Sequence, residues 1–199
     1  MKTKTIFGLA KEKGWFIMSH FILSVVISFS YIWKINMRND EQEISNLLFA
    51  YTHRFDEGDF EGAANLFQHA QIIVGASGET VDYLGLLDNW RRMVKLCDDS
   101  GTPRTMHTCT NAIINTNLDE CIASTRSYYI VYQQTDKLPL QAIVAGRYDD
   151  TFELVAGRWR FSERDYRMME MIGNISEHLH HSELILAKQL THSWRYRDS

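Results

Sequence analysis

The sequence predicts an α+β fold, a cone-shaped α+β barrel in which three helices pack on a strongly curved, mixed but mostly antiparallel sheet. Two helical segments come first, a strand and a third helix follow, and four strand segments come after them. The breaks between the long strands are short enough for hairpins, which join antiparallel neighbours. Strands and helices do not alternate in a βαβ pattern, which argues against a dinucleotide-type parallel sheet.

The first helix is expected to begin at Asp40 and to stop at Gly58. Its apolar residues have the spacing of one buried helical face: Ile44, Leu47, Leu48, Tyr51 and Phe55. Asp40 and Glu43 have the spacing of a capping box, with Asp in place of Ser or Thr. Gly58 supplies a left-handed stop, and Asp59 can cap a second, short helix.

The remaining segments are predicted from their periodicity. Residues 71–77 are β-branched and indicate a strand, whereas residues 80–97 return to helical spacing. Strand character then runs through residues 104–115, 120–135, 140–154 and 158–166. A curved sheet wrapped against helices leaves one open mouth, which suits a small-molecule pocket.

Length and composition indicate one ordinary globular domain. The chain has 199 residues, of which 45% are hydrophobic and 23% are charged. A net charge of −4, without a run of Lys and Arg, argues against a dedicated nucleic-acid binder. The 3 cysteines have no CxxC spacing, which favours a reducing compartment over a disulfide framework or a zinc site. We therefore expect a cytoplasmic protein.

Residues 1–37 form a hydrophobic leader that the predicted domain does not need. Four lysines precede an apolar stretch at residues 15–33, so this stretch could be a signal anchor that attaches the protein to a membrane. The leader could equally reflect a mis-assigned start, because Met37 stands just before the capped helix, and a cleaved signal is a third alternative. We expect the domain at residues 38–182 and an amphipathic tail at residues 183–199.

Six short segments follow one another in the order of a known family. They are Tyr51 with Asp56 before DFEGAANLF, MHTCTNAII at 106–114, SYYIVY at 127–132, AGRYDDTF at 145–152, GRWRFSER at 157–164 and GNISEHL at 173–179. Together they resemble the SnoaL-like branch of the nuclear transport factor 2-like superfamily over about residues 40–180. This superfamily includes dehydratases, isomerases, cyclases, small subunits of ring-hydroxylating dioxygenases and binding proteins, so the resemblance implies the cone fold but no single reaction.

The resemblance also implies three catalytic residues. In the dehydratases to which this branch is similar, such as scytalone dehydratase and bile acid 7-alpha-dehydratase, a tyrosine, an aspartate and a histidine converge in the cone. Tyr51, Asp56 and His107 stand in the matching segments of this chain. The family often has two adjacent histidines at the head of the second long strand, whereas Met106 precedes His107 here, so one proton carrier is absent.

The residue types themselves favour acid–base chemistry. His107 is the best candidate base, because imidazole exchanges protons near neutral pH. Asp56 could fix its tautomer, although a carboxylate at a helix C-terminus should have a raised pKa unless another group compensates. Tyr51 could donate to a substrate carbonyl or to a departing hydroxyl. On a continuous helix Tyr51 and Asp56 lie about 140° apart, so we expect them to converge only if the helix breaks before Asp56.

Each of these three residues also has a structural interpretation. Tyr51 could be a core tyrosine with a satisfied hydroxyl, and Asp56 could bond to the Gly58 turn. His107 could be a half-buried strand histidine bonded to a neighbouring backbone group.

Seven further side chains are candidates for binding the substrate. They are Trp90, Asn111, Tyr128, Tyr129, Arg147, Phe161 and Arg164. Asn111 alternates in phase with His107 along the predicted strand. Arg147 could bind an anionic group or pair with Asp149 or Asp150, and Arg164 has the same two interpretations. Trp90 is more often a core residue than a platform for a ligand.

We predict no bound metal and no cofactor. His178, His180 and His181 invite a metal site, but no fourth ligand stands at an obvious spacing. Phosphate-loop, HExxH and GxSxG patterns are also missing from the sequence. Any reaction should then be cofactor-free.

The predicted function is a cofactor-free lyase or isomerase that acts on a small apolar or cyclic substrate, hydroxylated and polyketide- or steroid-like. The alternatives are a non-catalytic ligand-binding protein and an accessory small subunit of a ring-hydroxylating dioxygenase. Apolar residues occur in both phases of strands 120–135 and 140–154, so a homodimer through the outer sheet face is expected.

Overall fold

The computed structural model describes residues 39–74 and 78–181 of the chain. The leader expected at residues 1–37 and the tail expected at residues 183–199 lie outside the described residues. Within the described ranges, no helix is long and apolar enough to cross a membrane.

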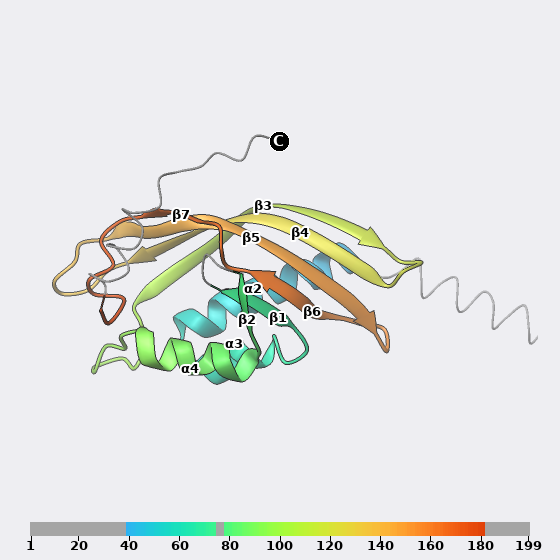
Figure 1. The fold of residues 1–199 in the computed structure, drawn as a ribbon. Helices are drawn as coiled ribbons and strands as arrows, with labels where there is room; N and C mark the ends of the chain where they lie inside the picture. The colour runs from blue at the N-terminus through green and yellow to red at the C-terminus, as the bar shows by residue number, and fades with distance from the viewer. Residues whose placement is uncertain (1–38, 75–77, 182–199) are drawn as a thin grey trace, which may run out of the picture. The chain divides into compact units, whose positions relative to one another are not determined.

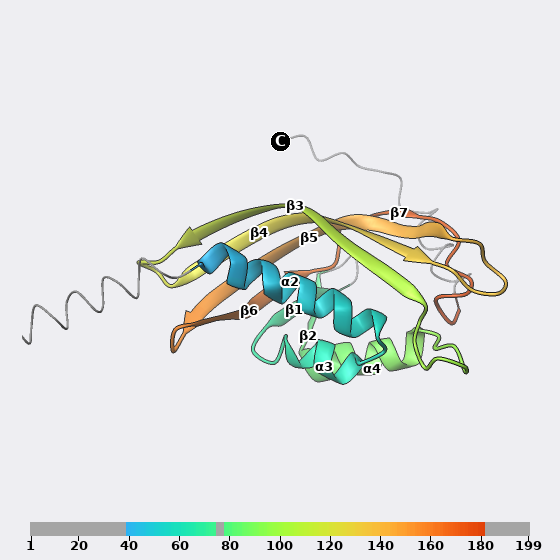
Figure 2. The same ribbon diagram turned by 180° about the vertical axis from the view of Figure 1, so that it is seen from behind.

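Three helices cover one face of a sheet (Figures 1 and 2). They are α2 (Asp40–Asp56), α3 (Phe60–Asn65) and α4 (Tyr83–Met93). Asp59 caps α3 by accepting a hydrogen bond from the Gly62 amide at 2.8 Å, as its position after Gly58 predicts. The predicted helix over residues 80–97 is wrong at its start, because Glu79–Val81 is strand β2 and Asp82 caps α4.

The sheet is mixed and mostly antiparallel, as predicted. Its strands are β1 (Gln71–Val74), β2 (Glu79–Val81), β3 (Thr105–Asn117), β4 (Ile122–Gln133), β5 (Gln141–Val155), β6 (Arg158–Asp165) and β7 (Met169–Ile172). They lie in the order β2-β1-β6-β5-β4-β3, and β7 pairs with β5 off this path. Strands β1 and β6 pair in parallel, and every other pairing is antiparallel.

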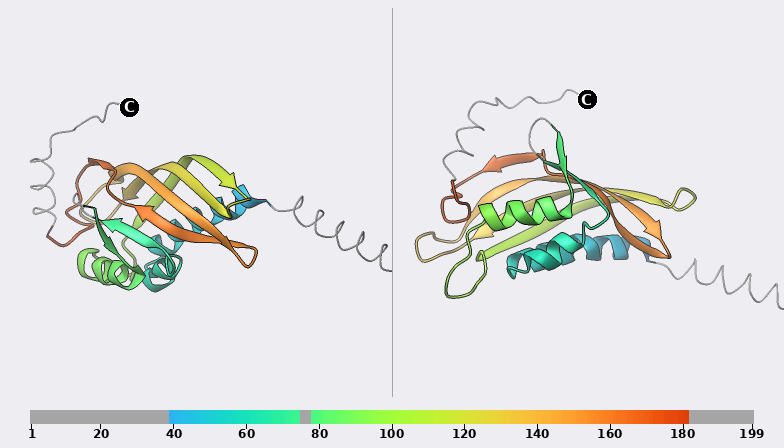
Figure 3. Two further views of the ribbon diagram at one scale, coloured as in Figure 1. Left: turned by 45° about the vertical axis from the view of Figure 1, so that its right-hand side comes forward. Right: turned by 60° about the horizontal axis from the view of Figure 1, so that its bottom comes forward.

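Strand β4 shows which face of the sheet belongs to the core. Its buried residues alternate with more exposed ones, and the buried set is Ala123, Thr125, Ser127, Tyr129, Val131 and Gln133. We call the face that carries this set the inner face, and the helices cover it. Figure 3 shows that no described helix covers the opposite, outer face.

The two ends of α2 are fixed by different contacts. At its start, Asp40 accepts a hydrogen bond from Trp159 Nε1 at 2.7 Å, and Glu43 accepts one from the Trp159 amide at 3.2 Å. The two residues of the predicted capping box therefore hold α2 to strand β6. After its end, Gly58 has a positive φ of 79°, and a Cβ there would lie 2.5 Å from the Gly101 carbonyl oxygen. This glycine is required both for the turn and for the close approach of the loop before β3.

Candidate functional site

One carboxylate joins the end of α2 to the beginning of β3. Asp56 Oδ1 lies 2.6 Å from His107 Nδ1 and accepts a hydrogen bond from Thr105 Oγ1 at 2.7 Å. Asp56 Oδ2 accepts a hydrogen bond from the His107 amide at 2.7 Å. A carboxylate only accepts hydrogen bonds, so Nδ1 of the ring carries the proton and Nε2 carries the free lone pair.

These contacts decide the charge state of Asp56. Burial raises the pKa of Asp56, but the hydrogen bonds and charge of His107 and the hydroxyl of Thr105 outweigh it and lower the pKa below its ordinary value. The sequence predicts a raised pKa at a helix C-terminus unless another group compensates. His107 and Thr105 are those compensating groups.

His107 faces the inner side of the sheet, among aromatic rings. It pairs with Val131, a buried residue of β4, and only 6% of its side chain is exposed. The imidazole lies 5.1 Å from the Phe55 ring and 6.3 Å from the Tyr51 ring, measured between centroids. Among the residues that the structure describes, none hydrogen-bonds to Nε2 of His107. The base nitrogen is therefore available in a site that is largely closed to water.

Tyr51 is almost fully enclosed, although its expected role is to donate a hydrogen bond to a substrate. It is 3% exposed, and its hydroxyl accepts a hydrogen bond from Tyr166 at 3.1 Å. Burial raises the pKa of Tyr51 well above its ordinary value, so the hydroxyl stays protonated. Helix α2 does not break before Asp56, so the expected route to convergence is wrong. Instead, Tyr51 and Asp56 both contact His107.

An ion pair occupies the interior behind Tyr51. Arg164 makes a bidentate pair with Asp150, with distances of 2.7 Å from Nε to Oδ1 and 2.8 Å from Nη2 to Oδ2. Neither side chain is exposed. Burial lowers the pKa of Arg164, but the Asp150 carboxylate outweighs it and holds that pKa above the ordinary value. Of the two interpretations of Arg164, the structure shows the paired one.

Aromatic rings surround this guanidinium. Its central carbon lies 4.2 to 5.6 Å from the ring centroids of Tyr148, Tyr51, Phe67, Phe161 and Tyr166. Cations over aromatic faces are attracted by the ring quadrupole. The interior beside the candidate site is therefore filled by an ordered cluster of charge and rings.

Besides Arg164, three of the predicted binding residues lie in this interior. Trp90 is 5.1 Å from the Phe55 ring and 6.0 Å from the Tyr51 ring. Tyr129 stacks on Tyr148 at 4.2 Å, and Phe161 is fully buried. Trp90 lies in the same aromatic cluster as His107, whereas Phe161 packs deeper in the core.

The other three do not share a pocket with His107, which corrects the expected site. Tyr128 is 48% exposed on the outer face, because it alternates with buried Tyr129. The Arg147 guanidinium lies over the Tyr128 ring at 5.8 Å, while Asp149 bonds to Arg126 and Asp150 bonds to Arg164.

Asn111 lies at a bulge between Thr110 and Ile113, where the register of β3 against β4 shifts. It is exposed and has a φ of 53°. The bulge ends the simple alternation that placed Asn111 in phase with His107.

Three residues that contribute to the site around His107 were not predicted from the sequence. Thr105 is two residues before His107 on the same strand, so the alternation could have indicated it. Tyr166 follows the last long strand and gives no local signal. His178 was considered as a metal ligand, yet its segment lies at the same end of the sheet as the Asp56–His107 contact, because Gln133 bonds to the Glu177 carbonyl and is the β4 partner of Thr105. Among the described residues, no three His, Cys, Asp or Glu side chains are grouped so that they could hold a metal ion.

A groove of about 380 Å³ lies on the outer face of the sheet and not at this site. Its polar lining includes Asn115, Arg126, Asp149 and Glu163. Their position on the outer face separates this groove from His107.

Solved structures of similar fold come from several bacteria. A protein of unknown function with a cystatin-like fold from Nostoc punctiforme has 21% identity and a TM-score of 0.53, with 67% of this chain and 93% of that chain covered. A protein of Novosphingobium aromaticivorans provisionally assigned as a scytalone dehydratase has 21% identity and a TM-score of 0.51, with coverage of 67% and 87%. A provisionally assigned aromatic ring hydroxylase of the same organism has 20% identity and a TM-score of 0.52, with coverage of 69% and 95%.

Likenesses at this level of identity show the fold alone. No curated protein matches the chain. The sequence model of the SnoaL-like domain matches residues 36–165, which include the whole of α2 and the Asp56–His107 contact. The cone of three helices on a curved, mixed sheet agrees with this match, and the chain belongs to the SnoaL-like domain family.

Proposed function

We propose that this protein is a cofactor-free lyase or isomerase of dehydratase type. Its substrate would be cyclic and hydroxylated, of a polyketide- or steroid-like kind, with a proton made acidic by a neighbouring carbonyl. The observation that carries the proposal is the 2.6 Å contact between His107 Nδ1 and Asp56, which leaves Nε2 without a partner among the described residues.

The geometry supports a division of roles. His107 Nε2 would remove the proton from carbon, and Asp56 would hold the ring and stabilise the imidazolium that forms. Tyr51 accepts from Tyr166, so its own proton could be donated to the oxygen that gains charge or leaves as water. Because the rings around His107 exclude water, these charge interactions would be strong.

A binding protein without chemistry is the second candidate. The filled interior counts against the catalytic roles, because Arg164 and Asp150 occupy space at the centre of the cone and Tyr51 is almost fully enclosed. In that case Asp56 would act only as a link between α2 and β3.

Activity would be tested on a panel of cyclic β-hydroxyketones, whose dehydration to a conjugated enone changes the ultraviolet absorbance. General acid–base assistance typically contributes about 10²–10⁴-fold, so His107→Ala should lower turnover by about that factor. Asp56→Asn should lower it less if Asp56 only orients the ring. The matched control is His69→Ala, because His69 is an exposed histidine away from the site.

The binding candidate predicts a different outcome. Ketones would bind, no enone would form above the uncatalysed rate, and His107→Ala would change affinity alone. Loss of turnover in His69→Ala as large as in His107→Ala would also count against the assigned base.

We also propose that the chain works as a cytoplasmic homodimer joined through the outer sheet face. Cys97, Cys109 and Cys121 are free thiols, which suits a reducing compartment. Exposed apolar side chains on the outer face, such as Met106 and Ile113, support the dimer.

A further inference from the structure

His178 is a buried histidine that the proposed roles leave unused. It lies in the segment after β7 and is 7% exposed. Its Nδ1 is buried and has no hydrogen-bond partner among residues 39–74 and 78–181. An unpaired polar atom in a protein interior is unfavourable, so such an atom is expected to find a partner that the described residues do not supply.

The backbone around His178 is held on several sides. Its carbonyl accepts a hydrogen bond from the Lys95 amide at 2.8 Å, and its own amide donates to the Ile175 carbonyl at 3.0 Å. Gln133 Nε2 donates to the carbonyls of Glu177 at 3.3 Å and Pro103 at 3.0 Å. The backbone position of His178 is therefore set by the fold.

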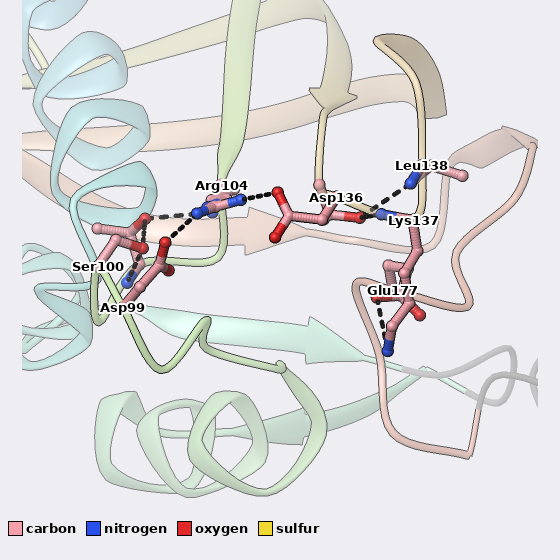
Figure 4. A network of polar contacts seen from close by, with 9 residues as sticks. Asp99, Ser100, Arg104, Asp136, Lys137, Leu138 and Glu177 are labelled. Atoms are coloured by element: carbon pink, nitrogen blue, oxygen red, sulfur yellow. Dashed lines mark hydrogen bonds and ion pairs between the residues drawn. The ribbon is translucent and has the colours of Figure 1, made fainter.

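Charged groups at the surface fix the same segment (Figure 4). Glu177, the residue before His178, lies 3.9 Å from Lys137 Nζ in the β4–β5 loop. In the same loop Asp136 pairs with Arg104 at 3.2 Å, and Arg104 also pairs with Asp99. These pairs join the loop before β3, the β4–β5 loop and the segment of His178.

The imidazole of His178 is neutral at neutral pH. Burial, followed by the nearby charge of His107, lowers its pKa to about 4. A proton gained by His107 during a reaction would oppose protonation of His178 further. Gln133, which bonds to the Glu177 carbonyl, is the β4 partner of Thr105, so His178 lies at the same end of the sheet as the Asp56–His107 contact.

We propose that His178 binds the carbonyl oxygen of the substrate through its Nδ1–H, as a neutral hydrogen-bond donor beside the His107–Asp56 pair. The inference rests on the proposed function and names the contact that the site makes with its substrate. Gln133 Oε1 is a second buried atom without a partner among the described residues, and its amide bonds to the residue next to His178. Gln133 Oε1 could therefore accept a hydrogen bond from a hydroxyl of the same substrate.

The proton abstraction moves one proton and two electron pairs. His107 Nε2 takes the proton from the carbon next to the carbonyl, and the electron pair of that C–H bond becomes the carbon–carbon double bond of an enolate. The carbonyl π electrons move to oxygen, where the Nδ1–H of His178 donates a hydrogen bond without losing its proton. A preorganised donor aimed at an oxygen that gains charge stabilises the transition state more than the ground state.

The test uses the full-length chain with two probes, the bicyclic ketone 2-tetralone and its oxygen-free counterpart tetralin. Tryptophan fluorescence gives both dissociation constants, and deuterium exchange at the carbons beside the carbonyl reports the action of His107. One hydrogen bond corresponds to about tenfold in affinity, so the wild type should prefer the ketone by about that factor. His178→Phe should abolish the preference, whereas His178→Asn should keep it, because an Asn amide can replace Nδ1–H.

The outcomes separate this inference from the proposed function. A ketone preference that survives in His178→Phe, or equal or absent binding of both probes by the wild type, overturns the role of His178. Nitrogen-15 shifts that place the proton of His178 on Nε2 overturn it as well. Exchange that persists in His107→Ala while the ketone preference is intact overturns the proposed function and leaves the contact standing.

Discussion

Arg164 carries a positive charge in the centre of the interior, and the carboxylate of Asp150 balances this charge. Removing one partner of a buried pair leaves an uncompensated charge and typically costs about 3–5 kcal/mol. We expect Arg164→Met to lower the free energy of unfolding in urea by about that amount. The control is Arg126→Met on β4, which breaks the exposed pair of Arg126 with Asp149 and should cost far less.

A double variant tests whether the loss of stability in Arg164→Met comes from the unpaired charge. Arg164→Met combined with Asp150→Leu removes both charges and should recover part of the lost stability. If the double variant is no more stable than Arg164→Met, the loss comes from packing against the surrounding rings.

At the scale of elements, Asp56 is the connection between the end of α2 and the head of β3. Its pKa is lowered on folding, so the stability it contributes is present above the ordinary aspartate pKa of about 3.9 and is lost as the pH falls through the lower folded value. Asp56→Asn should lower the free energy of unfolding by about 2 kcal/mol at pH 7, the size of a hydrogen bond to a charged group.

Urea unfolding at several pH values measures this effect. The difference between the wild type and Asp56→Asn should shrink in acid, because the wild-type carboxylate is then protonated. Asp88→Asn on α4 is the control, since Asp88 is exposed and lies 3.9 Å from Arg92. A difference that does not depend on pH would show that the charge of Asp56 contributes nothing.

At the scale of the whole molecule, the outer sheet face carries exposed apolar side chains. Met106, Ile113, Tyr128 and Met171 are 65%, 62%, 48% and 58% exposed there. Arg126 pairs with Asp149 on this face, so these two charges do not by themselves oppose contact between two copies. Isologous contact of this face with itself would give the proposed homodimer.

Light scattering checks the dimer. The wild type should have twice the mass of the 23.2 kDa chain, and Tyr128→Lys should shift it toward the single chain, because a charge would be buried between the copies. The control is Leu84→Lys on α4, at a residue that is 56% exposed on the helical side. A wild type with the mass of one chain would contradict the proposal.

Local signals predicted α2, α3 and the four long strands, because a helix or a hairpin is specified by contacts between near neighbours in the chain. Gly58 and Asp59 stand at the boundaries that their turn and capping chemistry indicates. The short strands β2 and β7 gave no such signal. Each has four residues or fewer, and each forms by pairing with a strand that already exists.

The sequence by itself determined the order of α2, α3, β1, α4 and β3 to β6, the curved mixed sheet, and the residues Tyr51, Asp56 and His107 as candidates. Tertiary structure alone decided that His107 bridges the other two, that Arg164 pairs with Asp150, and that Tyr128 and Arg147 lie on the outer face. The physical reason is the separation of the partners along the chain: Asp56 and His107 are 51 residues apart. No local periodicity encodes a hydrogen bond of that kind, because it exists only after the sheet has folded over the helices.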